Sequence, residues 1–64
     1  MKVREIIRIV KADGWVHVST KGSHRKFEHP VKTGHVTIPG HPRDELHPKT
    51  HRSILRQAGL RRSR

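Results

Sequence analysis

Residues 15–28 read WVHVSTKGSHRKFE, two short alternating segments joined by a glycine turn. In the first segment, from Trp15 to Thr20, two valines alternate with polar residues, which is typical of a half-buried strand. Lys21-Gly22 predicts a tight connection, and the segment from Ser23 to Glu28 predicts a second strand. This stretch therefore predicts an antiparallel hairpin. A third alternating segment, from His35 to Ile38, extends the hairpin into a three-stranded meander.

Helical spacing appears on both sides of the strands. Four apolar residues near the N-terminus are spaced as on one helix face: Val3, Ile6, Ile7 and Val10. They predict a helix from about Lys2 to Ala12 or Asp13, which ends at Gly14. A second stripe, with the same spacing, consists of His51, Ile54, Leu55 and Ala58. It predicts a helix from Pro48 or Lys49 to Ala58, with proline in the first turn.

The parity of the strands predicts which residues share a face. The residues expected to face the core are Val16, Val18, Phe27, Val36 and Ile38. The residues then expected on the opposite, open face are His17, His24, Lys26, His35 and Thr37. Arg25 has the parity of the core residues, so it must lie at the end of the sheet or a bulge must shift the register there. Trp15 is expected to pack in the core, with base stacking on the open face as the alternative.

Together these elements predict one small α+β domain. The order helix, three strands, helix gives a two-layer fold in which both helices cover the single apolar face of the sheet. The domain is expected to span residues 1–60, and residues 61–64 form a basic C-terminal tail. A chain of 64 residues has no room for a second domain.

Charge is the strongest compositional signal. Fifteen Lys and Arg residues against five Asp and Glu residues give a formal net charge of +10, which predicts a polyanionic partner. The chain has no cysteine, which excludes disulfides and thiolate metal sites. Arg8 and Lys11 interrupt the apolar residues near the N-terminus, so we expect no secretory or membrane segment and a cytoplasmic location.

The candidate catalytic group is His24, which follows the glycine turn on the expected open face. Histidine can take and give a proton near neutral pH. Gly22 and Ser23 would position the turn, and nearby cationic groups would bind a phosphodiester. These expected phosphate-binding residues are Lys26, Arg25, Lys21, His17 and His35. His17 and His35 could act as second proton carriers, although solvated surface histidines that help bind phosphate are the alternative.

The chain has seven histidines, so a metal site must also be considered. His47 and His51 are four residues apart, and His41 is nearby, a spacing that can ligate zinc on one helix face. Pro48 is expected to start the helix after His47, which removes the pair from a common face. We therefore expect no metal and no cofactor.

Four motifs carry a resemblance that covers nearly the whole chain. They are Gly14-Trp15, residues 21–27 (KGSHRKF), residues 36–41 (VTIPGH) and residues 53–60 (SILRQAGL). In this order they resemble the HicA-type mRNA interferase toxins, which have a fold like that of the double-stranded RNA-binding domain.

The resemblance implies a function and a partner. It implies that His24 stands at the catalytic histidine position and that the protein cleaves RNA without a metal. It also implies a HicB-type antitoxin that covers the His24 face in a hetero-oligomer. One departure is His51, where the family commonly has an apolar residue. Two other classes of function stay open from the residues alone: a non-catalytic RNA-binding module and an interaction subunit whose charge complements an acidic protein.

Overall fold

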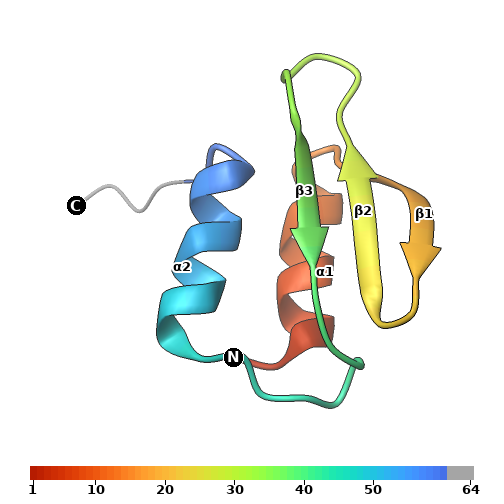
Figure 1. Cartoon of the computed structure of the whole chain (residues 1–64). Helices are drawn as coiled ribbons and strands as arrows, with labels where there is room; N and C mark the ends of the chain where they lie inside the picture. Colours follow the sequence, from red (N-terminus) through yellow and green to blue (C-terminus); the bar gives the residue numbers. More distant parts are fainter. Residues whose placement is uncertain (61–64) are drawn as a thin grey trace.

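The computed structural model describes residues 1–60, which form two helices and a three-stranded sheet (Figure 1). The elements are α1 (Val3–Ala12), β1 (Val16–Lys21), β2 (His24–Glu28), β3 (His35–Ile38) and α2 (Pro48–Gln57). The strands form one antiparallel sheet in the order β1-β2-β3. The predicted α+β fold and its order of elements are confirmed. The predicted basic tail, residues 61–64, lies outside the described residues.

Helix α1 begins and ends where the sequence predicts. The Glu5 carboxylate accepts a hydrogen bond from the Lys2 backbone N–H at 2.8 Å, which satisfies a free donor of the first turn. Gly14 follows the helix with φ of +105°, a conformation that favours glycine. A Cβ atom at this position would lie 2.7 Å from Nε2 of His29. Glycine is therefore required by both the backbone conformation and the packing.

The β1–β2 turn consists of Gly22 and Ser23. Gly22 has φ of +62°, and no non-glycine residue of the described chain has a positive φ. A glycine at the first central position and an ordinary residue at the second are typical of a type II′ hairpin turn. Lys21 pairs with His24 across this turn. The turn thus fixes the position at which His24 enters the sheet.

The core lies between the helices and one face of the sheet. Its members are Val3, Ile6, Val10, Trp15, Phe27, Val36, Ile38, Leu46, Ile54 and Ala58. Both helices contribute, and Phe27 pairs with Val36 in the register of β2 and β3. Trp15 packs in the core as expected, and its Nε1 donates a hydrogen bond to the Ala58 carbonyl at 3.3 Å.

The predicted orientation of β1 is wrong. Val16 and Val18, expected in the core, are 56% and 47% exposed. His17 pairs directly with Phe27, and residues directly opposite in an antiparallel pair share a face, so His17 lies on the helix-facing side. The register then shifts between His17 and Ser19, which is a β-bulge. His17 and Ser19 therefore lie on opposite faces although they are two residues apart, because His17 pairs with Phe27 and Ser19 pairs with Lys26. Trp15 fills the core beside this strand.

The segment between β2 and β3 is tied to the end of α1 by His29. Its Nδ1 accepts the backbone N–H groups of Val31 and Lys32, both at 3.0 Å. Its Nε2 therefore carries the proton and donates to the Asp13 carbonyl at 2.8 Å. Its ring stands edge-on to that of Trp15, with centroids 5.1 Å apart. His29 thus has a structural role that the sequence did not indicate.

Helix α2 runs beside β3, whereas α1 lies behind the sheet (Figure 1). The loop between β3 and α2 is held against the start of the chain, because Val3 N–H donates to the Asp44 carbonyl and Leu46 N–H to the Met1 carbonyl, both at 2.9 Å. This places the first turn of α2 next to the end of β3. Neither of the helices in residues 1–60 is long and apolar enough to cross a membrane.

Candidate functional site

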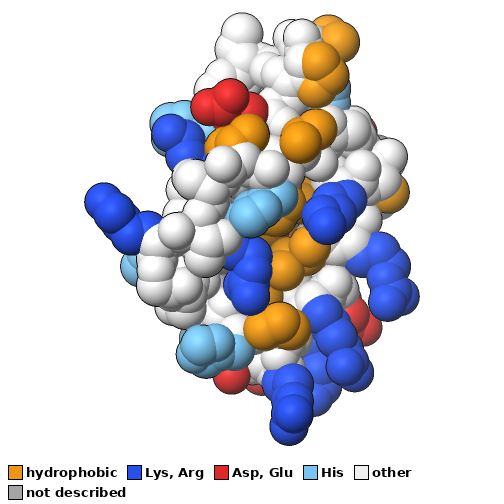
Figure 2. Space-filling model, turned by 90° about the vertical axis from the view of Figure 1, so that its right-hand side faces the viewer, with side chains coloured by type: hydrophobic (Ala, Val, Ile, Leu, Met, Phe, Trp, Pro, Cys, Tyr) orange, Lys and Arg blue, Asp and Glu red, His pale blue; other side chains and the backbone are white. Residues whose placement is uncertain are grey.

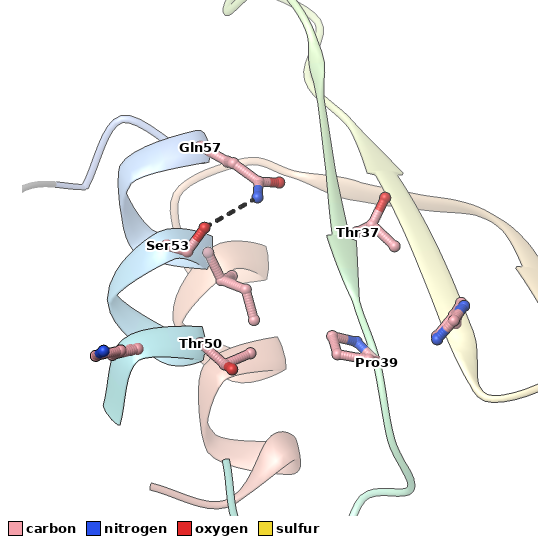
Figure 3. Close-up of a pocket in the computed structure, with 8 residues that line it drawn as sticks. Thr37, Pro39, Thr50, Ser53 and Gln57 are labelled. Atoms are coloured by element: carbon pink, nitrogen blue, oxygen red, sulfur yellow. Dashed lines mark hydrogen bonds between the residues drawn. The ribbon is translucent and has the colours of Figure 1, made fainter. Parts of the chain in front are cut away.

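A cleft of about 420 Å³ lies between the sheet and α2 (Figure 3). One wall comes from the open side of the sheet and the other from one face of α2. The lining residues are His24, Thr37, Pro39, Lys49, Thr50, Ser53, Ile54 and Gln57. The cleft is open to solvent and contains the histidine that the sequence singled out.

Strands β2 and β3 position the sheet wall. Lys26 pairs with Thr37, and neither residue belongs to the buried set, so both side chains lie on the open face. His24 is two residues before Lys26 and therefore shares that face. Because Arg25 pairs with Ile38, the antiparallel register brings His24 opposite Pro39. His24 is exposed at this end of the cleft.

Helix α2 forms the second wall through one polar stripe. Its start is set by His47, whose Nδ1 accepts the Lys49 backbone N–H at 3.1 Å, and by Pro48 in the first turn. Lys49, Ser53 and Gln57 are spaced by four residues, so they lie on one face of the helix. Gln57 Nε2 donates to Ser53 Oγ at 3.4 Å, a long hydrogen bond within this stripe.

The cleft is cationic. Among residues 1–60, Lys49 is the one permanently charged side chain that lines it, and none of the five acidic residues does. The two carboxyls with lowered pKa lie elsewhere. The hydrogen bond from Lys32 holds the pKa of Asp13 below its usual value, and that from the N-terminal amine does the same for the pKa of Glu45. The cleft therefore suits an anionic ligand, and the part of the chain that the structure describes supplies no carboxylate to its lining.

Three of the predicted phosphate-binding residues share the open face with His24. Lys26 stands across from Thr37, Lys21 pairs with His24 beside the turn, and His35 pairs with Glu28 at the far end of β2. These residues do not line the cleft itself but continue its cationic surface across the sheet.

The other two predicted residues, His17 and Arg25, lie on the helix-facing side. The predicted open-face position is wrong for His17, whereas Arg25 has the core-side parity that the sequence indicated. Arg25 occupies the end of the sheet, which was one of the two expected solutions, and its Nη1 donates to the Gly40 carbonyl at 2.7 Å. His17 packs edge-on against Phe27, with ring centroids 5.5 Å apart. Both line a separate hollow with Ile7 and Lys11. The bulge and the direct pairing with Phe27 explain the position of His17.

That hollow opens on the β1 side of the molecule. Figure 2, a view onto this side, shows Lys and Arg side chains gathered around apolar ones, with few acidic side chains among them. The net charge of +10 is thus spread over more than the His24 face. A polyanion has cationic surface available on both sides of the sheet.

The contribution of α2 was not predicted from the sequence. Lys49, Thr50, Ser53 and Gln57 line the cleft together with His24. Their four-residue spacing was a readable signal, but a polar stripe on a helix is usually a solvated face. Which side of β3 the helix occupies depends on tertiary packing.

Residues 1–60 contain no group of three or more histidine or acidic side chains that could hold a metal ion. Of the three histidines that were considered, His47 caps α2. His51 lies in a groove between the helices, where its Nδ1 is buried and has no hydrogen-bond partner within the described residues.

Comparisons with known proteins agree with this architecture. The family described as "HicA toxin of bacterial toxin-antitoxin" matches residues 3–60. A chain of a structure titled "Toxin-Antitoxin complex from Streptococcus pneumoniae" is 36% identical, with a TM-score of 0.77, and the match covers 94% of this chain and 98% of that chain. The comparison with curated proteins finds no match. Because the family match spans nearly all of the chain and the fold agrees, the chain belongs to the HicA toxin family.

Proposed function

We propose that residues 1–60 form a metal-independent endoribonuclease, an mRNA interferase that acts as the toxin of a toxin–antitoxin pair. The observation that carries the proposal is the exposed His24 in a cationic cleft that no carboxylate of residues 1–60 lines. Membership of the HicA family supports a toxin role. A cytoplasmic location follows from the proposed mRNA substrate.

RNA brings its own nucleophile to such a cleft. The 2′-hydroxyl attacks the adjacent phosphorus, its proton leaves, and the bond from phosphorus to the 5′-oxygen breaks as that oxygen takes up a proton. His24 in its neutral form accepts the first proton, or in its charged form donates the second, while water in the open cleft completes the other transfer. The expected products are a 2′,3′-cyclic phosphate and a free 5′-hydroxyl.

The surrounding cations would bind the substrate and stabilise the extra negative charge of the phosphorane. Lys49 lines the cleft with His24 and would bind the phosphate of the bound RNA. Lys26, Lys21 and His35 continue the open face and would hold flanking phosphates. Arg25 has no part in this assignment because its guanidinium is engaged with the Gly40 carbonyl.

The proposed partner protein is a HicB-type antitoxin that covers the His24 cleft. The similar structure from Streptococcus pneumoniae is of a toxin-antitoxin complex, which supports an antitoxin for this chain too. A cationic cleft is best covered by an acidic surface, which would neutralise Lys49 and exclude RNA at the same time. The toxin would then be held in an inactive hetero-oligomer.

The substrate chemistry provides the first test. A single-stranded RNA is cleaved by the purified protein, and a matched RNA with one 2′-deoxy nucleotide on the 5′ side of the cut is tested beside it. We expect the deoxy substitution to abolish cleavage at that bond and to leave binding unchanged, because it removes only the nucleophile. Cleavage of the deoxy bond would contradict the mechanism.

A non-catalytic RNA-binding module remains the second candidate, since the cationic open face could bind RNA without any chemistry. In the same experiment, binding of both RNAs with cleavage of neither would favour it.

A further inference from the structure

The two ends of the cleft differ in chemistry. At one end Pro39 and Thr50 lie near each other across the cleft (Figure 3). Lys49, which also lines the cleft, precedes Thr50 in the first turn of α2, and His24 lies opposite Pro39 in the register of β2 and β3. At the other end Gln57 projects from α2 toward Thr37 on β3, and the Ser53 hydroxyl lies against the helix and accepts the hydrogen bond from Gln57 (Figure 3). The first end holds the proton carrier and the cation, and the second end holds neutral hydrogen-bonding groups.

The distance between these ends suits one nucleotide. Lys49 and Gln57 are two helical turns apart, which corresponds to about 12 Å along α2. A nucleotide whose phosphate lies at the His24 end of the cleft would extend its ribose and base along the helix toward Gln57. The cleft volume of about 420 Å³ is sufficient for a group of that size.

Gln57 has the chemistry to read a base edge. Its side-chain amide offers a carbonyl acceptor and two N–H donors in one plane, of which one N–H is directed at Ser53 Oγ. Unpaired RNA bases present planar sets of donors and acceptors on their edges, and glutamine can match such an edge with two hydrogen bonds. The other lining side chains at this end, Thr37 and Ser53, offer single rotating hydroxyls.

We propose that Gln57, held by Ser53, is the specificity-determining residue of the cleft and reads the base of the nucleotide next to the cleaved phosphate. This inference rests on the proposed endoribonuclease function. Under this proposal α2 recognises a base in addition to packing against the core, and the sheet supplies the reactive group, His24.

The test compares cleavage-site profiles on a randomised single-stranded RNA. Wild type, Gln57→Ala and Arg56→Ala are each used at a concentration that cuts each molecule at most once, and the bases around each cut are counted. Arg56 is the sequence neighbour of Gln57 and serves as the matched control, because it lines the groove on the other side of α2. We expect Gln57→Ala to reduce the preference at one position beside the cut by about tenfold or more, and Arg56→Ala to keep the wild-type profile.

A Ser53→Ala variant separates recognition from folding. It is expected to weaken the same preference less than Gln57→Ala, with a melting temperature close to that of the wild type. A wild-type profile for Gln57→Ala, on a protein that cleaves, would overturn the inference and leave the proposed function standing. Absence of cleavage by the folded wild-type protein would overturn both.

Discussion

His24 and Lys49 line the same cleft although one belongs to β2 and the other to the first turn of α2. The first was recognisable in the sequence because it follows a glycine turn on an alternating strand. The second was not, because one lysine on a strongly basic chain carries no signal of its own. The catalytic pairing we propose is therefore a product of tertiary structure, with the proton carrier and the anion-binding group supplied by separate elements.

The role of Lys49 is tested by substitution with alanine. We expect Lys49→Ala to lower kcat/KM for RNA cleavage by about tenfold or more and to reduce the salt slope of RNA binding by about 1. The control is Arg8→Ala in α1, which removes one positive charge from an exposed helix position that lines neither the cleft nor the hollow near β1. Equal losses in the two variants would show that only net charge matters.

At the scale of the elements, the sequence predicted the helices and strands but not every face. Apolar spacing and the helix-ending glycines were sufficient to predict both helices and their buried faces, since each helix has only one apolar stripe. For β1 the alternation is compatible with burial of either face. In the structure Trp15 fills the core, a bulge lies at Val18, and both valines are exposed. Because β1 faces the other way, His17 lies on the helix-facing side of the sheet and not with His24 on the open face. The observed site therefore differs from the expected one.

Helix α2 contains a residue that weakens its packing. The Nδ1 atom of His51 is buried without a hydrogen-bond partner in the described chain, in a groove that is otherwise lined mostly by apolar side chains. We expect His51→Leu to stabilise the fold by about 1 kcal/mol, which for a domain of this size raises the melting temperature by about 4–8 °C. His41→Leu, in an exposed loop position, is the control and should not raise it. A lower melting temperature for His51→Leu would show that the groove needs the polar ring.

At the scale of the whole molecule, one ion pair joins three parts of the chain. Lys32, in the segment between β2 and β3, binds the Asp13 carboxylate at the end of α1, and its Nζ also donates to the Ala58 carbonyl at the end of α2, at 3.0 Å. A domain of 64 residues buries little apolar surface, so contacts that join its elements count for a large share of its stability.

This ion pair predicts a dependence of stability on pH. Lys32 lowers the pKa of Asp13, so the contribution of the carboxylate is fully present above its ordinary value of 3.8 and is lost as the pH falls through the lowered value. We expect Asp13→Asn to melt at a lower temperature than wild type at pH 7, and the difference to shrink once the pH is below 3.8. Thermal unfolding followed by circular dichroism across this range checks it. A difference that persists unchanged in acid would assign the effect to packing rather than charge.

The fold follows from the sequence to a large extent because its signals are local: apolar spacing, glycine turns and a proline at a helix start. The cleft could not be predicted from the sequence, because it depends on how α2 lies beside β3. That arrangement is set by buried contacts of Ile54 and Ala58 with residues far away in the sequence. His24 could be selected in advance, whereas its neighbours on α2 could only be found in the folded chain.

The most direct test of the account is cleavage of single-stranded RNA in excess chelator by the wild-type protein and by His24→Ala. His24 is exposed and outside the core, so the variant is expected to keep the wild-type melting temperature and to bind RNA. The account predicts cleavage by the wild type with 2′,3′-cyclic phosphate ends, and none by His24→Ala. Full cleavage by the variant, or loss of wild-type cleavage in chelator, would contradict it.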